Sequence, residues 1–197
     1  MPSFTKKAIL DAFLRIAAKK PLEKITVRDI VDACGVNRNT FYYYFQDIYA
    51  VVEELGRISI ASVPQDRSLG ETLELLYLQW ALFMEEHPRA MRSFIISLGA
   101  DGADRYFAPM LDEVLLAALS HDMAGTPLPP ERQQLLLDFV RCALIGVCVN
   151  TARQKDPPAS AVCGAELRRL GDAMLTGLRQ EIHTSEENRK GQEGEKT

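Results

Sequence analysis

Apolar residues recur at helical spacing along nearly the whole chain, and this periodicity constrains the fold more than any other feature of the sequence. The first such segment predicts a helix over about residues 5–19, which Pro21 ends. Five apolar residues share one face of this helix: Ile9, Leu10, Phe13, Ile16 and Ala17. The aromatic run Thr40–Phe45 contains strand-forming residues, but it is short and lies between two capping signals, which favours a helix. We therefore predict an all-α fold.

Further periodic segments after residue 65 predict a larger body made of helices. Ser68 and Glu71 form a capping box at the start of a long amphipathic helix, and Pro88 ends that helix. Gly99 is expected to stop the next helix. The predicted helices of the body cover about residues 69–87, 89–98, 106–118, 131–154 and 163–182. Residues 184–197 contain no apolar side chain, so we expect a disordered tail.

Charge is distributed unevenly along the chain. The net charge is −4 and the isoelectric point about 5.5, which taken alone argues against nucleic acid as a partner. The first fifty residues have eight basic and five acidic side chains, a net charge of +3, whereas the remainder has fifteen basic and twenty-two acidic, a net charge of −7. A basic head on an acidic body suggests two tasks in one chain. Chance variation of charge over fifty residues is the alternative.

Motifs that carry catalytic or metal-binding chemistry are absent from the sequence. The four cysteines form no CxxC pair, and the three histidines have no zinc-ligand spacing. The sequence also lacks GxSxG, HExxH and a glycine-rich phosphate-binding loop. We expect no metal, no cofactor and no enzymatic activity. Since the sequence has neither a signal-peptide pattern nor about 18 consecutive apolar residues, we expect a cytoplasmic protein that does not bind a membrane.

Residues 26–45 contain the signals of two short helices joined by a tight turn. Thr26 and Asp29 have the spacing of a capping box, with Asp in place of the usual Glu. Gly35 stands where a left-handed residue ends a helix, and Asn37 can cap the next helix. This layout is that of a helix-turn-helix, whose second helix enters the major groove of DNA.

The second helix of this pair has an inward and an outward face. Phe41 and Phe45 lie together on the side expected to pack against the other helices. The outward side carries groups suited to DNA, namely Arg38, Asn39, Tyr42 and Tyr43. Arginine can bind guanine and asparagine can bind adenine bidentately, while tyrosine hydroxyls suit phosphate oxygens. The alternative is a polar surface patch on an ordinary helical hairpin.

Three stretches of this region resemble the DNA-binding head of the TetR family of transcriptional regulators. They are Lys24–Ile30 (KITVRDI), Cys34–Arg38 (CGVNR) and Thr40–Phe45 (TFYYYF). The segment Tyr42–Asp47 (YYYFQD) more specifically resembles the branch that includes the dihydroxyacetone-kinase regulators. The resemblance covers about residues 5–60, and beyond it only size and helical layout agree.

The resemblance implies a set of DNA contacts at eight residues: Thr26, Arg28, Arg38, Asn39, Thr40, Tyr42, Tyr43 and Tyr44. Arg38 and Asn39 would read bases, and most of the others would contact the DNA backbone. Tyr44 stands where many members have His and lies between the inward and outward faces, which leaves its role open. Ile48 stands where many members have a phosphate-binding Lys. Losing one phosphate contact should lower the salt slope of binding by about 0.9.

The resemblance also implies a division of the chain. Residues 1–47 would form a three-helix DNA-binding domain, and a connecting helix over about 47–62, capped by Asp47, would lead to an effector-binding and dimerisation domain over 65–183. A homodimer would form through the last two helices, about 131–154 and 163–182, where small residues allow close helix approach. Internal packing of these helices is the alternative.

The body also contains aromatic and methionine residues at helical spacing that could line a ligand pocket. They are Tyr77, Trp80, Phe83, Met84, Phe94, Tyr106, Phe107, Met110 and Phe139. Such residues form a core more often than a pocket.

These observations lead to the hypothesis of a homodimeric transcriptional regulator that a small-molecule effector releases from a double-stranded DNA operator, most simply a repressor. The alternative is a co-regulator that acts through a protein partner and binds DNA weakly or not at all. The sequence identifies neither the operator, the effector nor the target genes.

Overall fold

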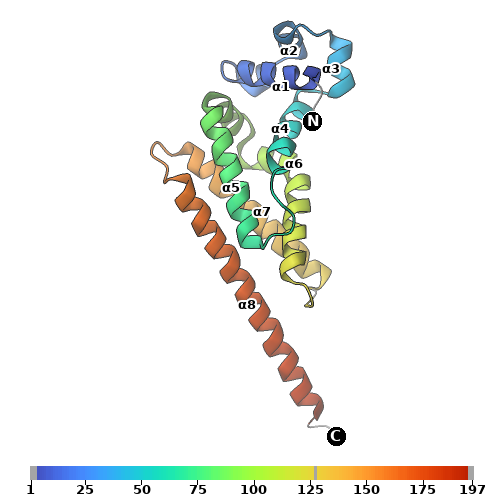
Figure 1. Cartoon of the computed structure of the whole chain (residues 1–197), viewed down its shortest axis with the longest axis vertical. Helices are drawn as coiled ribbons and strands as arrows, with labels where there is room; N and C mark the ends of the chain where they lie inside the picture. Colours follow the sequence, from blue (N-terminus) through green and yellow to red (C-terminus); the bar gives the residue numbers. More distant parts are fainter. Residues whose placement is uncertain (1–3, 127, 195–197) are drawn as a thin grey trace.

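The structure is a computed structural model that describes residues 4–126 and 128–194, with side chains described as far as residue 184. These residues form eight α-helices and one short 3-10 helix, with no strand among them, which confirms the all-α prediction. Figure 1 shows α1, α2 and α3 gathered at one end of the molecule, with the longer helices below them and α8 projecting past the body.

The head consists of α1 (Phe4–Ala17), the 3-10 turn η1 (Leu22–Lys24), α2 (Val27–Cys34) and α3 (Arg38–Tyr44). Its core is formed by the apolar faces that the periodicity predicted. Ile9, Phe13, Ile30 and Phe41 are completely buried there. Each of the three helices has one apolar face, and burial of these large side chains requires the three faces to meet. This requirement fixes the relative orientation of the helices.

Helix α4 (Ile48–Ile60) joins the head to the body, and Asp47 caps it by accepting a hydrogen bond from the Ala50 amide at 2.9 Å. Val51 and Val52 of α4 are buried in the core of the head. The same helix lines a cavity in the body with Leu55. It therefore belongs to the packing of both parts.

Helix α6 completes the core of the head, which the sequence did not predict. Ala90 and Phe94 are buried there, and the Phe94 ring stacks on that of Phe13 with centroids 5.5 Å apart. The Ser97 hydroxyl also donates to the Glu23 carboxylate of η1 at 2.8 Å. The first part of α6 is thus packed against the head although it lies far along the chain.

The body is formed by α5 (Leu69–Glu86), α6 (Pro88–Asp122), α7 (Pro130–Arg153) and α8 (Ser160–Gly194). The sequence predicted two helices where α6 lies, separated at Gly99. Gly99 is indeed non-helical, with φ 62° and ψ −166°, and it kinks α6 between two helical parts. A residue with a side chain would be strained in this conformation.

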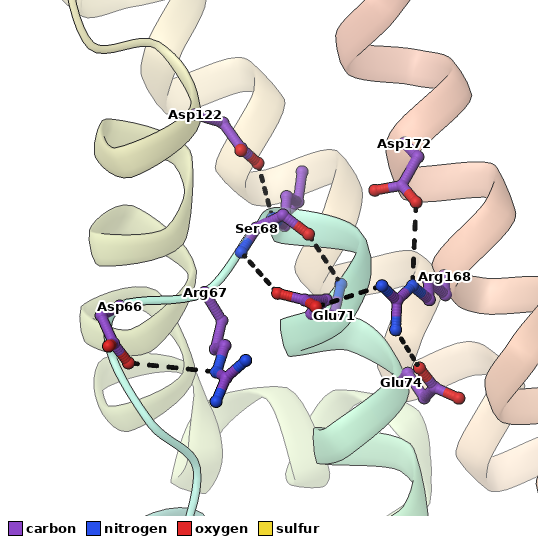
Figure 2. A network of polar contacts seen from close by, with 9 residues as sticks. Asp66, Arg67, Ser68, Glu71, Glu74, Asp122, Arg168 and Asp172 are labelled. Atoms are coloured by element: carbon purple, nitrogen blue, oxygen red, sulfur yellow. Dashed lines mark hydrogen bonds and ion pairs between the residues drawn. The ribbon is translucent and has the colours of Figure 1, made fainter.

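The start of α5 is anchored to two other helices (Figure 2). The predicted capping box is present: the Ser68 hydroxyl accepts from the Glu71 amide and the Glu71 carboxylate accepts from the Ser68 amide. Asp122, at the end of α6, accepts a hydrogen bond from the Leu69 amide at 2.6 Å. Arg168 of α8 lies 3.1 Å from Glu71, so one carboxylate serves both the cap and the contact with α8.

Arg141 of α7 is the most elaborately paired side chain of the body. It is 9% exposed and binds Asp104 at 2.8 Å, Asp112 at 2.5 Å and Asp138 at 2.8 Å. Burial lowers the pKa of the guanidinium, but the hydrogen bonds that it donates to its three carboxylate partners outweigh that effect and raise the pKa. Two of these partners lie on α6, so the cluster joins α6 to α7.

Helix α8 extends to Gly194, whereas the lack of apolar residues predicted a disordered tail from residue 184. Glu, Gln, Lys and Arg are good helix formers, so this polar segment can continue a helix without packing. Residues 195–197 of the predicted tail lie outside the described residues.

Candidate nucleic-acid interface

The turn between α2 and α3 is built by contacts local in the sequence. Thr26 and Asp29 form the predicted capping box of α2, with the Thr26 amide donating to the Asp29 carboxylate at 2.8 Å. Gly35 ends α2 with φ +73°, where an L side chain would be strained. Asn37 then caps α3 by accepting from the Thr40 amide at 2.8 Å. These contacts confirm the predicted helix-turn-helix geometry.

Asp29 is the electrostatic centre of this turn. Its carboxylate accepts a hydrogen bond from the Lys20 ammonium at 2.7 Å and others from the hydroxyl and amide of Thr26. These donors, with Lys20 the largest contributor, lower the pKa of Asp29 from 3.8 to about 2. The Asp29 carboxylate therefore remains ionised near neutral pH. Its bond to Lys20 connects α2 to the segment that follows α1.

Helix α3 presents the outward face that the helical wheel predicted. Phe41 is completely buried and Phe45 nearly so, while Tyr42 is 54% and Tyr43 82% exposed. Arg38 and Asn39 are also exposed, in the first turn of the helix. The structure thus brings four of the candidate DNA-contacting residues together on one solvent-exposed surface.

The two candidate threonines are engaged within the head. The Thr26 hydroxyl donates to Asp29 at 2.7 Å, and the Thr40 hydroxyl donates to the Asn37 side chain at 3.0 Å. Each hydroxyl has a single proton, so neither can donate to a phosphate while these bonds persist. In this structure Thr26 therefore belongs to the cap of α2, and Thr40 belongs to the cap of α3.

The remaining two candidates differ in exposure. Arg28 lies on α2 and its side chain is 78% exposed, with Asp32 as an ion-pair partner at 3.5 Å. An ion pair this exposed is weak, so the guanidinium can exchange it for a phosphate. Tyr44 is half-buried and its ring makes an edge contact with that of Tyr43 at 5.0 Å. Tyr44 lies between the two faces, as the helical wheel indicated.

A separate cavity of about 160 Å³ lies in the body between α4, α5, α6 and α7. Four of the nine residues suggested from sequence line it: Trp80, Phe83, Phe94 and Phe107. Met84, Met110 and the other three do not. Tyr77 is buried in the body core, and burial raises the pKa of its hydroxyl to about 12.

Two of the unmatched aromatic residues have other contacts. Tyr106 stacks on Tyr49 of α4 with centroids 5.0 Å apart. Phe139 is 64% exposed on α7. The sequence did not predict the part of the cavity wall that α4 supplies, which includes Val52, Leu55 and Gly56. The pattern of residues in α4 is equally compatible with a helix that only connects two domains.

Among the described residues, no group of three or more His, Cys, Asp or Glu side chains has an arrangement that could bind a metal ion. The exposed surface of α3 offers hydrogen-bond donors and aromatic edges, and the cavity offers apolar surface.

The N-terminal residues 9–55 match the sequence model of a family described as "Bacterial regulatory proteins, tetR family". A comparison with curated protein sequences finds no match.

Several solved structures are similar to the whole chain. One is the "Dihydroxyacetone kinase operon activator DhaS", with 15% identity and a TM-score of 0.56 over 93% of this chain and 98% of that one. Another is a tetR-family transcriptional regulator from Streptomyces coelicolor, with 16% identity and a TM-score of 0.59 over 93% and 87%. A third is the fatty acid degradation regulator FadR from Bacillus halodurans, with 17% identity and a TM-score of 0.56 over 91% and 98%. At this level of identity the shared property is the fold.

Proposed function

We propose that this chain is a regulator of the TetR family and acts as a homodimeric repressor that a small molecule releases from its DNA operator; the match of residues 9–55 to the family model and the shared fold support this proposal. The domain boundaries follow this division: residues 1–47 bind DNA, residues 47–62 connect, and residues 65–183 bind the effector and dimerise. The protein acts in the cytoplasm, where the DNA is, and catalyses no reaction.

The observation that carries this proposal is the exposed face of α3. Arg38 and Asn39 lie in its first turn, where the side chains of a recognition helix reach base edges. Tyr42 and Tyr43 follow one turn later and offer hydroxyls to phosphates on either side of the groove. Arg28 adds a charged contact from α2. In this reading Thr26, Thr40 and Tyr44 support the interface chiefly by positioning these groups.

Dimerisation through α7 and α8 is supported by the apolar surface these helices leave exposed. Leu135 and Phe139 of α7 are 70% and 64% exposed, and Val162 and Leu170 of α8 are similarly open. In composition and length α7 resembles a membrane-spanning helix, with a mean hydropathy of 1.7, yet only 33% of that segment is buried. A second copy of the chain would cover this surface.

The glycines on these helices suit such an interface. A Cβ built at Gly146 of α7 or at Gly177 of α8 would meet no atom within 4 Å, so both positions face open space in the single chain. Small residues let the helices of two copies approach closely. A twofold axis between the two copies of the chain would let their two α3 helices enter successive major grooves, which are about 34–36 Å apart.

Release by an effector is supported by the position of the cavity. Its wall includes α4, which also contributes to the core of the head. A molecule that binds one position of α4 better than another would shift the population between DNA-binding and released states.

One observation favours the alternative of a co-regulator with little DNA binding of its own. Ile48 stands at the start of α4, where the family resemblance implies a phosphate-binding lysine in many members, and its side chain packs partly against the core of the head. The head therefore has one phosphate contact fewer and only a small positive charge.

Fluorescence anisotropy with purified protein tests the proposal. The operator is first selected from random duplex DNA or from the intergenic DNA beside the gene. We expect a palindromic site bound far more tightly than mixed-sequence DNA at the same salt concentration. Equal, weak binding to all sequences would support the co-regulator and would contradict the repressor.

A further inference from the structure

The cavity between α4, α5, α6 and α7 has an almost wholly apolar wall. Aromatic rings of Trp80, Phe83, Phe94 and Phe107 supply much of it, and aliphatic side chains such as Leu144 fill the spaces between them. No charged residue lines it. A charged ligand would therefore lose its hydration without gaining an ionic partner, which is strongly unfavourable.

The polar groups of the wall are few. The Ser59 hydroxyl donates to the Leu55 carbonyl of its own helix at 3.2 Å, so its proton is already used. Burial raises the pKa of the Cys148 thiol to about 12, which keeps this group neutral. Gln79 is the third polar residue, and its amide has no hydrogen-bond partner within the described part of the chain. Within the described part of the chain, Gln79 is therefore the uncommitted side chain of the wall that can both donate and accept hydrogen bonds, while the Trp80 indole N–H can only donate.

The volume limits the size of a ligand. A dry apolar cavity of about 150 Å³ in another protein accommodates benzene. The cavity here, at about 160 Å³, has room for a molecule of that order with a small substituent.

We propose that this cavity binds an uncharged, largely apolar molecule of about single-ring size, with at most one polar group, which pairs with Gln79. The inference rests on the proposed effector response and gives the chemical class of the effector. The apolar lining disfavours ions, the volume of about 160 Å³ matches a single ring, and the Gln79 amide favours a ligand that carries a hydroxyl or carbonyl group.

Trp80 provides the readout, because it is the only tryptophan of the chain and it lines the cavity. The full chain is titrated with toluene and with the ions benzylammonium and benzoate, and ethylbenzene and nitrobenzene serve as the uncharged controls that match these two ions in size. We expect toluene to shift the Trp80 emission and raise the melting temperature, and the two ions to change neither at the same concentration. Equal or stronger effects from either ion, or no effect from toluene, would overturn the proposal.

Variants with a smaller cavity test whether toluene binds in it. Ala103→Leu places a larger side chain in the cavity wall, so we expect the toluene affinity to fall at least tenfold. Ala100→Leu is the matched control, since Ala100 is exposed on the same helix, and it should bind toluene like the unaltered chain. If Ala103→Leu does not fold, Ile145→Phe fills the same cavity from α7. Unchanged toluene affinity in a folded cavity-filling variant would place the binding elsewhere and refute the assignment.

The role of Gln79 is tested with phenol by calorimetry. The unaltered chain should prefer phenol to toluene, and Gln79→Leu should abolish that preference while still binding toluene. An unchanged phenol-to-toluene ratio would refute the role of Gln79.

These titrations use no DNA, so their outcome is independent of operator recognition. If toluene shifts the Trp80 emission but leaves operator binding unchanged, the proposed release mechanism is wrong and the proposed ligand class is supported. If toluene does not bind but operator recognition is intact, the proposed ligand class is wrong and DNA binding is supported.

Discussion

Asn37 determines which side chains α3 can offer to DNA. Its side chain accepts a hydrogen bond from the Thr40 amide, and this cap sets the residue at which α3 starts. With that start, Phe41 points inward, and four side chains point outward: Arg38, Asn39, Tyr42 and Tyr43. A change of one residue in this start would rotate the helix face by about 100°. The identity of single residues therefore controls the interface through geometry as well as through contacts.

Arg38→Ala should weaken binding to the selected operator by about 1–3 kcal/mol and relax base preference at one position of each half-site. The reason is the loss of a bidentate contact to one base. Anisotropy titrations against the operator and its single-base variants measure both effects. The control is Tyr42→Phe, which removes one hydroxyl and should weaken all sequences alike by about 0.5–1.5 kcal/mol. If Arg38→Ala lowered affinity for every sequence equally, its role would be a phosphate contact.

Asp29→Asn should destabilise the head in a pH-dependent way. The pKa of Asp29 is lowered in the folded state, to about 2 from 3.8, so its carboxylate stabilises the fold above about pH 4, and this stabilisation is lost as the pH falls toward 2. The difference in free energy of unfolding between Asp29→Asn and the unaltered chain should be largest near neutral pH and shrink toward pH 2. Urea unfolding followed by circular dichroism at several pH values measures it.

The matched control for this experiment is Asp32→Asn on the same helix. Asp32 is exposed and pairs only with Arg28, at 3.5 Å, so its replacement should have little effect on stability. A deficit in Asp29→Asn that is the same at every pH would contradict the assigned role of the ionised cap.

At the scale of helices, α4 packs closely against α6 at a glycine. A Cβ added at Gly56 would lie 2.5 Å from the Phe107 ring and 3.3 Å from the Met110 sulfur. The absence of a side chain thus lets the ring of Phe107 lie directly on α4, beside the cavity. The stacked rings of Tyr49 and Tyr106 make a second contact between the same two helices.

Gly56→Ala should lower the free energy of unfolding by about 1–3 kcal/mol, because Phe107 has to move to admit the methyl group. Thermal or urea unfolding measures the change. Gly164→Ala is the control: Gly164 also lies within a helix, but its added Cβ would meet neighbours at 3.4 Å, so the higher helix propensity of alanine should dominate and stabilise the chain by up to about 1 kcal/mol. Combining Gly56→Ala with Phe107→Leu should recover part of the loss, and equal stability of the two alanine variants would contradict this packing argument.

The elements that the sequence predicted are those that short-range contacts define. The capping boxes at Thr26 and Ser68 each join residues three apart, and the break at Gly99 is a property of one residue, so all three were visible in the sequence. The packing of Phe94 on Phe13 joins residues far apart in the chain, and no local pattern distinguishes it from packing within the body.

The candidate site likewise has a part that the sequence predicted and a part that it did not. The outward face of α3 follows from the period of one helix, and the wheel predicted its exposure correctly. The cavity is formed where four helices meet, so the pattern found aromatic residues such as Trp80 and Phe107 but also selected Tyr77, which is core, and Phe139, which is exposed. The predicted disorder after Thr184 failed for another reason: lack of apolar residues excludes packing but does not exclude a helix.

For the whole molecule, the head and the body differ in the sign of their net charge and in the surface that they expose. The basic head carries the outward face of α3, and the acidic body carries the exposed apolar residues of α7 and α8. A mildly positive head should bind DNA weakly on its own, because each head makes few phosphate contacts. Two heads joined by a stable body would bind far more tightly, since the second binds within the same complex.

Phe139→Glu should therefore produce a monomer with weak operator binding and an intact fold. The introduced carboxylate would be buried without a partner between the two copies. Analytical ultracentrifugation gives the mass, anisotropy gives the affinity, and circular dichroism verifies the helices. Leu82→Glu is the control, because Leu82 is 52% exposed on α5, outside the proposed interface, and it should leave the dimer intact. A dimeric Phe139→Glu protein would exclude this interface.

The stacking of Phe94 on Phe13 has a consequence for protein engineering. A hybrid that joined this head to another body at a junction just after α4 would separate the head from Ala90 and Phe94, which complete its core, and would leave a hole beside Phe13. A working hybrid must therefore carry the first two turns of α6 along with the head, or rebuild those two side chains in the new body.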